Sequence, residues 1–222
     1  MNRVFVGYDP RQPIAFTVCA HSVARHSKKP VAITPLILSQ LPIKRRGLTE
    51  FTFSRFLVPY LCDFKGKAFF MDADMIVTGD ITELFEREDM NAVSVMQAQE
   101  RFEWPSAMMF NCGSCLKLTP AYIDNPQNVL FDLAWANYIG ELPTEWNQIV
   151  GYGPTKPSKL YHYTRGIPIW SETQGEIEDE LWCDELDAAN YTCEYADLMG
   201  KSIHAERPRN IVLEGEDATE TH

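Results

Sequence analysis

The sequence predicts an α/β fold, a single domain built on one central sheet that is mixed but mainly parallel. Two observations support this prediction. The chain opens with an apolar run, an amphipathic stretch and a second apolar run, which is the strand–helix–strand order of a parallel sheet. Its 222 residues, 45% hydrophobic and 23% charged, have an ordinary globular composition. One domain is the default for that length.

The elements of the first half follow from apolar runs and from the residues that interrupt them. In chain order we expect a buried strand at residues 3–8, a helix at 14–25, a strand at 31–38, a helix at 49–61 and a buried strand at 68–71. The helix at 49–61 rests on apolar side chains at helical spacing, with Pro59 near its end.

The second half alternates short strands with capped helices. Asp80 and Glu83 have the spacing of a capping box, so a helix should begin at Asp80. Thr119 is an N-cap candidate followed by proline at the first helical position. Strands are expected at residues 92–97, 108–111 and 159–163, and a helix at 129–139.

The net charge argues against two classes of partner. With 20 Lys and Arg against 31 Asp and Glu, the chain carries a formal charge of −11. Nucleic acid and anionic membranes are bound through clustered Lys and Arg, so we expect neither as a partner. Most of the imbalance lies at residues 171–222, which hold 15 acidic and three basic side chains.

The short apolar runs predict where the protein is located, and the wide spacing of its six cysteines predicts whether they are reduced. The first apolar run is too short for a signal peptide, and no window approaches the roughly 18 apolar residues of a membrane span. We therefore expect a cytoplasmic protein with reduced thiols. A zinc site joining Cys112 and Cys115 to Cys183 and Cys193 is the alternative use of the cysteines.

Asp72-Ala73-Asp74 is the most informative short motif. Its carboxylates follow a predicted buried strand, and α/β sheets bind ligands at that end of their strands. Alternate residues of a strand point to the same side, so both carboxylates can face one hard divalent cation. The alternative is that Asp72 and Asp74 only solvate the strand end.

The segment from Tyr161 to Trp170 supplies groups that complement these carboxylates. His162 can add a neutral imidazole, which with two carboxylates suits Mn²⁺. Gly166 lets backbone N–H groups approach a phosphate. A lone histidine is usually structural, but together with the two aspartates we interpret His162 as a metal ligand.

The chain resembles the retaining, nucleotide-sugar-dependent glycosyltransferases of family eight, which have the glycosyltransferase-A fold and include glycogenin and bacterial lipopolysaccharide galactosyltransferases. The matching segments, in the family's order, are residues 4–9 (VFVGYD), 53–59 (FSRFLVP), 70–77 (FMDADMIV), 110–113 (FNCG) and 162–166 (HYTRG). All of them lie within the first 170 residues.

The resemblance implies a set of ligand-binding residues. The residues implied to bind the donor are Gly7, Tyr8, Asp9, Arg55, Asp72, Ala73, Asn111, Gly113 and Gly166. Within this set, the residues after the first strand would hold uracil and ribose, and Asn111 and Gly113 would line the sugar and acceptor pocket. Asp72, Asp74 and His162 would bind Mn²⁺ or Mg²⁺. Arg55 would lie near the diphosphate or brace the two aspartates, unless it forms a surface ion pair.

Two departures from the family's pattern concern the chemistry. Many relatives carry an Asp-Gln pair beneath the anomeric carbon, and this chain has no Asp-Gln dipeptide. The candidates for that role are Asp132, expected on the helix at 129–139, and the segment 145–148 (EWNQ) with Gln148. The family's closing motif often carries a lysine after the glycine; here Arg165 is our candidate for the missing cation.

The resemblance implies an enzyme that transfers a hexose from a UDP-sugar to a hydroxyl of a carbohydrate or other acceptor, with retention. Residues 1–170 would form the catalytic part, and residues 171–222 an acidic extension packed on the same domain, with a frayed tail at 214–222. The alternatives are a catalytically silent nucleotide- or sugar-binding protein of the same fold, and a metal-dependent phosphoesterase. The sequence does not predict an oligomeric state.

Overall fold

The computed structural model describes residues 1–88, 91–97, 101–152 and 156–202. The chain divides into two compact units, residues 1–189 and 190–222. The first unit therefore extends past residue 170, and the expected tail at 214–222 lies outside the described residues. In the second unit, helix α6 (Tyr195–Met199) buries none of its side chains. Among the described residues no helix is long and apolar enough to span a membrane.

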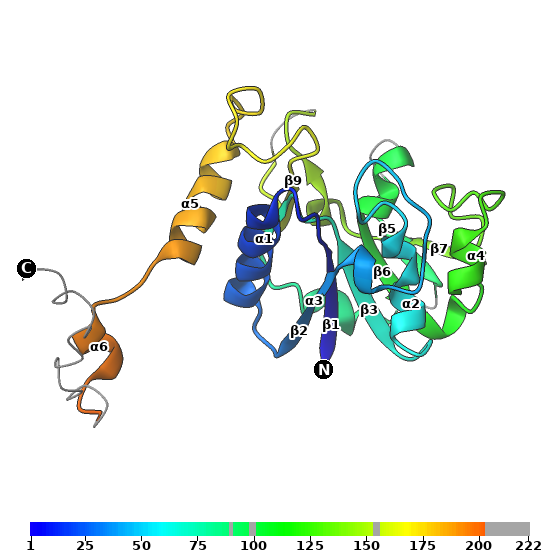
Figure 1. The fold of residues 1–222 in the computed structure, drawn as a ribbon, viewed down its shortest axis with the longest axis horizontal. Helices are drawn as coiled ribbons and strands as arrows, with labels where there is room; N and C mark the ends of the chain where they lie inside the picture. The colour runs from blue at the N-terminus through cyan, green and yellow to red at the C-terminus, as the bar shows by residue number, and fades with distance from the viewer. Residues whose placement is uncertain (89–90, 98–100, 153–155, 203–222) are drawn as a thin grey trace, which may run out of the picture. The chain divides into compact units, whose positions relative to one another are not determined.

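The first unit alternates strands with short helices (Figure 1). In chain order its strands and α-helices are β1 (Asn2–Gly7), α1 (Pro13–His26), β2 (Val31–Leu36), α2 (Val58–Leu61), β3 (Lys67–Met71), β4 (Met75–Val77), α3 (Glu83–Glu86), β5 (Val93–Val95), β6 (Ala107–Asn111), α4 (Pro120–Asp124), β7 (Ile139–Glu141), β8 (Gln148–Ile149), β9 (Leu160–His162) and α5 (Asp179–Asn190). Its 3₁₀ helices are η1 (Leu38–Gln40), η2 (Ser54–Leu57), η3 (Arg101–Ser106), η4 (Cys112–Ser114) and η5 (Thr144–Trp146).

A six-stranded mixed sheet is the centre of the first unit and confirms the predicted fold class. Its strand order is β2-β1-β3-β6-β5-β7. Strand β1 runs parallel to both β2 and β3, and β7 runs parallel to β5. Strand β6 runs antiparallel to both of its neighbours, β3 and β5. A separate small sheet, β4-β9-β8, was not expected from the sequence.

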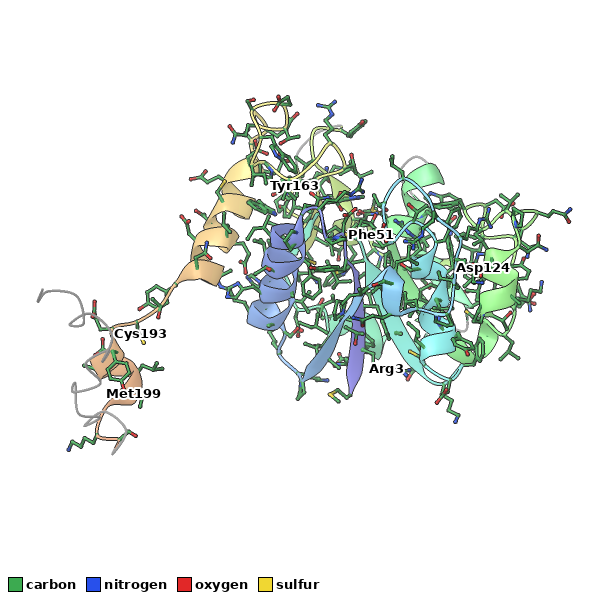
Figure 2. All side chains as sticks on the ribbon, viewed as in Figure 1. Arg3, Phe51, Asp124, Tyr163, Cys193 and Met199 are labelled. Atoms are coloured by element: carbon green, nitrogen blue, oxygen red, sulfur yellow. The ribbon has the colours of Figure 1, made fainter. Side chains whose placement is uncertain are left out.

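Apolar side chains cover both faces of the central sheet (Figure 2). Val4 and Val6 pack in the cluster that includes Val23 of α1, whereas Phe5 packs in the cluster that includes Phe56. This alternation explains why β1 reads as a continuous apolar run, because each of its faces is covered. Helix α5 adds Trp182, which is fully buried in the α1-side cluster.

The prediction of a helix at residues 129–139 is wrong. The described backbone there forms turns, with Leu133 at a φ of 56°. Asp132 Oδ1 accepts a hydrogen bond from the Ala134 N–H, which competes with helical pairing. The apolar residues that suggested a helix are buried for another reason: Leu130 and Trp135 fill the core, and Trp135 Nε1 donates to the Leu130 carbonyl at 3.0 Å.

Two other helix boundaries also differ from expectation. The helix expected at 49–61 is shorter, because only the 3₁₀ turn η2 followed by α2 forms; α2 ends at Leu61, two residues after Pro59, as expected. Helix α3 begins at Glu83; Asp80 instead accepts hydrogen bonds from the N–H and hydroxyl of Thr82. The cap at Thr119 is confirmed, because its hydroxyl accepts from the Tyr122 N–H.

Candidate metal and nucleotide site

The topology places a switch point at the carboxyl ends of β1 and β3, and we call this place the crevice. Strand β1 lies between β2 and β3: the chain passes from β1 to β2 on one side, and from β2 it crosses back to β3 on the other side of β1. Such switch points are where open α/β sheets bind ligands. Val6 is level with Met71 in the ladder, so Gly7, the last residue of β1, and Asp72, the residue after β3, lie at the same edge.

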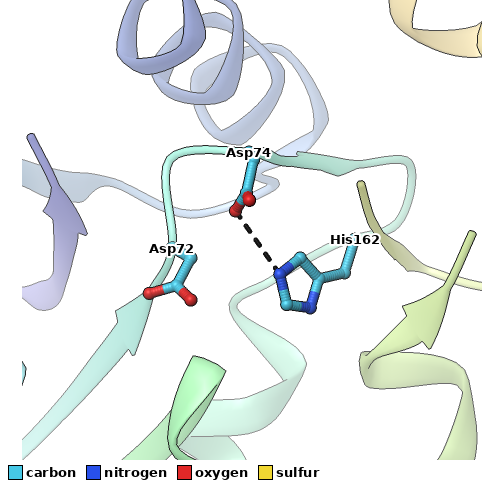
Figure 3. Close-up of side chains that lie close together, drawn as sticks. All are labelled: Asp72, Asp74 and His162. Carbon is cyan, nitrogen blue, oxygen red and sulfur yellow. Dashed lines mark ion pairs between the residues drawn. The ribbon is translucent and has the colours of Figure 1, made fainter. Parts of the chain in front are cut away.

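Three metal-ligating side chains gather beside this crevice. One ligand atom from each of Asp72, Asp74 and His162 lies within 4.8 Å of the other two. They converge from the turn between β3 and β4 and from β9 (Figure 3). The small sheet fixes this geometry: Met75 is level with His162, and the Tyr163 N–H donates to the Asp74 carbonyl at 2.9 Å.

The donor set suits a divalent cation of the Mn²⁺ or Mg²⁺ type. Two carboxylates and one imidazole are hard or borderline ligands. Asp72 is 7% exposed and His162 2% exposed, so the ligand atoms are held out of bulk water. Asp74 Oδ1 is buried and accepts no hydrogen bond from the described residues; it faces His162 Nε2 at 3.4 Å. A bound cation would satisfy that oxygen.

Arg55 braces this cluster from inside the core. Its Nη2 lies 2.9 Å from Asp72 Oδ1. Its other nitrogens donate to the carbonyls of Pro105 and Phe51, at 2.9 and 3.3 Å. With only 7% of the residue exposed, Arg55 is a buried partner of Asp72 and not a surface ion pair.

Ser106 and Asn147 also join the site; Asn147 belongs to the candidate segment 145–148, whereas no role was expected for Ser106. The Asp72 N–H donates to the Ser106 carbonyl at 3.0 Å, and Asn147 Nδ2 donates to Ser106 Oγ at 2.9 Å. Asn147 is fully buried, and none of the described residues donates to its Oδ1. In the sequence only their neighbours distinguish these two residues. Asn147 precedes Gln148, and Ser106 precedes an apolar run.

Asn111 and Gly113 are not brought together with the aspartates. Because β6 is antiparallel to β3, Asn111 is level with Lys67 at the amino end of β3, whereas Ala107 is level with Met71. The Cys112 N–H donates to the Gly66 carbonyl, which places Gly113 at that same far edge. The expectation that Asn111 and Gly113 line the sugar and acceptor pocket beside the aspartates is therefore wrong. Ser106, at the other end of β6, lies at the edge of the sheet that carries Asp72.

The residues after β1 lie at the expected edge. A Cβ on Gly7 would lie 2.5 Å from the Phe51 ring, so only glycine fits there. The Tyr8 ring meets Phe16 edge-on at 5.6 Å. Asp9 is buried against Arg11, and hydrogen bonds from the Arg11 side chain hold the pKa of Asp9 below its usual value. Ala73, between the two aspartates, is buried.

The candidates for the reactive face do not join the metal cluster. Gln148 is level with Tyr161, so these two side chains share one face of the small sheet and His162 lies on the opposite face. Gln148 and Tyr161 line a cavity of about 620 Å³. Asp132 lies in the turn described above. Arg165 is largely exposed and pairs with Glu176 at 3.2 Å, while Gly166, at a φ of 114°, turns the chain after β9.

The cysteines form no metal site among the residues that the structure describes. The one cluster of three metal-ligating side chains found there contains no cysteine. Burial raises the pKa of Cys115 to about 12. Burial, and then the charges of Asp74 and Asp72, raise the pKa of Cys19 well above its usual value. These are inert, neutral thiols.

Comparison with known proteins gives one sequence relative and several similar structures. No protein-family model matches the chain. Protein CDI of Arabidopsis thaliana is 34% identical over an alignment of 228 positions, which covers 85% of this chain and 87% of that protein. An active-site mutant of LgtC is similar in structure, with a TM-score of 0.60 and 12% identity over 88% of this chain and 99% of that one. The glycosyltransferase GlyE of Streptococcus pneumoniae TIGR4 gives a TM-score of 0.58 and 19% identity over 84% and 61%.

Proposed function

This chain belongs to the family of Protein CDI from Arabidopsis thaliana and has a glycosyltransferase-A-like fold; from that premise we propose that it is a metal-dependent, retaining hexosyltransferase of the family-eight type. It transfers a hexose from a UDP-sugar to a hydroxyl of a carbohydrate or other acceptor. The observation that carries the proposal is the cluster of Asp72, Asp74 and His162 at the crevice between β1 and β3.

Charge supports a diphosphate ligand at this cluster. When bound, a divalent cation supplies positive charge that offsets the charge developing on a leaving diphosphate. Asp72 and Asp74 alone would cancel that charge. Arg55, paired with Asp72 at 2.9 Å, adds one positive charge, so the loaded site has a net charge near +1 and attracts an anionic donor.

The proposed reaction takes place on one face of the sugar. Transfer breaks the anomeric C–O bond, the bonding electrons leave with the diphosphate, and the acceptor oxygen forms the new bond. No Asp-Gln pair is present to act as a nucleophile. We therefore favour attack on the side from which UDP leaves, with the acceptor proton passing to the departing phosphate oxygen and Asn147 orienting the sugar.

Replacing ligands one at a time tests this function. Asp74→Ala and His162→Ala should abolish metal-dependent hydrolysis and transfer of UDP-glucose and UDP-galactose, because each removes a donor from the cluster. The control is Asp184→Ala, an exposed aspartate on α5. Unchanged turnover in both ligand variants would refute the metal assignment. UDP binding without turnover of any donor by the wild-type chain would support the catalytically silent alternative instead.

A further inference from the structure

Two buried thiols, Cys62 and Cys112, meet at the edge of the central sheet that lies opposite the metal cluster. Cys62 follows α2, Cys112 follows β6, and both belong to the apolar cluster around Phe56. The Cys112 thiol donates a hydrogen bond to the sulfur of Cys62. The backbone fixes this arrangement. The Lys65 N–H donates to the Cys62 carbonyl at 3.0 Å, and the Cys112 N–H donates to the Gly66 carbonyl at 2.9 Å, so the turn that begins at Cys62 ends against Cys112.

Cys115, the third cysteine of this region, is engaged elsewhere. Its Sγ donates to the carbonyls of Ala92 and Asn111, at 3.2 and 3.3 Å. Cys112 and Cys115 are spaced as a C-x-x-C motif, but the hydrogen bond of Cys112 runs to Cys62 instead. The closest thiol pair of this region therefore joins two distant segments of the chain.

Cys62 differs from the other buried cysteines because its thiolate is stabilised. The hydrogen bond from Cys112, and then the positive charge of Arg3, lower the pKa of Cys62 below its usual value against the effect of burial. Arg3 is held at this edge, since its Nη2 and Nε donate to the Lys67 carbonyl at 3.1 and 3.4 Å. The thiolate is the nucleophilic form of cysteine. The pair thus combines a nucleophile, Cys62, with a thiol that keeps its proton, Cys112.

The turn after Cys62 brings this nucleophile close to solvent. Cys62 is itself 5% exposed, and it lies between the exposed residues Leu61 and Asp63. Asp63 and Phe64 both have a left-handed backbone, with φ of 50° and 52°. That conformation is strained for a bulky residue such as Phe64. A small oxidant can therefore reach the sulfur at the start of an exposed and strained turn.

We propose that Cys62 and Cys112 form a reversible disulfide when a hydroperoxide oxidises Cys62. The Cys62 thiolate attacks one peroxide oxygen, the O–O bond breaks, and hydroxide leaves, so that Cys62 becomes a sulfenic acid. The Cys112 sulfur then attacks the Cys62 sulfur; the S–S bond forms, the S–O bond breaks, and the Cys112 proton leaves with the hydroxyl group as water. The two sulfurs lose two electrons, which reduce the hydroperoxide. The inference does not rest on the proposed function.

Peptide mapping after oxidation tests the inference. The reduced wild-type chain is treated with hydrogen peroxide, its remaining thiols are blocked with N-ethylmaleimide, and a tryptic digest is analysed by mass spectrometry. Trypsin leaves Cys62 in the peptide 56–65, and Cys112 with Cys115 in the peptide 102–117. The digest should contain these two peptides joined, and dithiothreitol should separate them.

Cys115→Ser is the matched control, because Cys115 lies in the same tryptic peptide as Cys112 and is equally buried. It should keep the cross-link. Cys112→Ser should lose the cross-link and leave a Cys62 sulfenic acid that dimedone captures. A cross-link that disappears in Cys115→Ser and persists in Cys112→Ser would overturn the pairing.

The exposed Cys183 is an internal control that needs no variant. Burial and nearby aspartates raise its pKa, so it is the more accessible but less reactive thiol. In the wild-type chain the link between Cys62 and Cys112 should therefore form at a lower dose of hydrogen peroxide than modification of Cys183. Oxidation of Cys183 at doses that leave both Cys62 and Cys112 free to react with N-ethylmaleimide would overturn the inference and leave the proposed function standing.

Discussion

Arg55 and Asp72 form the buried ion pair on which the site depends most. Removing one partner of such a pair leaves an uncompensated charge in the core. Arg55→Ala should therefore lower the free energy of unfolding by about 3 kcal/mol, measured by urea denaturation without metal. Arg46→Ala, which removes an exposed partner of Glu50, should change it by less than about 1 kcal/mol. Equal losses in the two variants would contradict the structural role given to Arg55.

Two glycines that looked equivalent in the sequence should respond differently to alanine. A Cβ on Gly7 would lie 2.5 Å from Phe51, whereas on Gly113 the nearest atom is at an ordinary 3.5 Å. Gly7→Ala should lower the free energy of unfolding by about 2 kcal/mol through overpacking, and Gly113→Ala should leave it unchanged or raise it slightly. Thermal melting of both variants is the measurement. A stable Gly7→Ala variant would count against the tight turn after β1.

The pairing of Asp9 with Arg11 gives folding a dependence on acidic pH. Hydrogen bonds from Arg11 lower the pKa of Asp9 from 3.8 in the folded protein. The stabilisation is therefore fully present above pH 3.8 and is lost as the pH falls through the lower, folded pKa. The unfolding free energies of the wild type and Asp9→Asn should differ at pH 6 and converge below pH 3.8. A difference that stays constant with pH would contradict this assignment.

At the scale of elements, local patterns predicted what short stretches determine. Strands β1 and β3 and helix α1 follow from apolar runs and spacing within themselves. The direction of β6 does not, because it depends on pairing with distant β3 and β5. Asn111, which the resemblance assigned to the sugar and acceptor pocket, lies at the opposite edge for that reason, and Ser106 lies beside Asp72 instead. The turns at 129–139 show the same limit, since the core buries Leu130 and Trp135 without a helix.

The β4–β9 pairing is the element-level feature that assembles the metal cluster. The ligand chemistry of the residues predicted that Asp74 and His162 share one metal site, and the resemblance implied the same; the ladder supplies the physical reason, because Met75 is level with His162. Gln148, by contrast, lies on the other face of the same small sheet. Successive side chains of a strand point to opposite faces, so Gln148 shares a face with Tyr161 and not with His162.

At the scale of the whole molecule, α5 belongs to the compact first unit although it lies in the acidic region. Trp182 is fully buried. The Glu185 carboxylate lies 2.5 Å from His21 Nδ1 and 3.0 Å from Arg25 Nη1, both on α1. A chain ending at Ala189 should therefore keep the full-length melting temperature and metal affinity. Trp182→Ala should lower the free energy of unfolding by about 3 to 5 kcal/mol. Destabilisation by the truncation, or a neutral Trp182→Ala, would contradict this boundary.

The charge of the chain does not follow this boundary, because residues 171–189 of the first unit hold eight acidic and no basic side chains. Residues 1–170 hold 16 acidic and 17 basic side chains, so the part that carries the crevice and the metal cluster is close to neutral. An anionic donor can approach that part without strong repulsion. The net charge of −11 arises from the region after it.

The most direct test of the central claim is calorimetric titration of UDP-glucose and UDP-galactose into the protein with and without Mn²⁺. The account predicts that a donor binds only to the metal-loaded chain, and that His162→Ala abolishes this binding whereas Asp184→Ala preserves it. Donor binding of equal strength without metal, or undiminished in His162→Ala, would contradict the claim that Asp72, Asp74 and His162 form the metal site for the diphosphate.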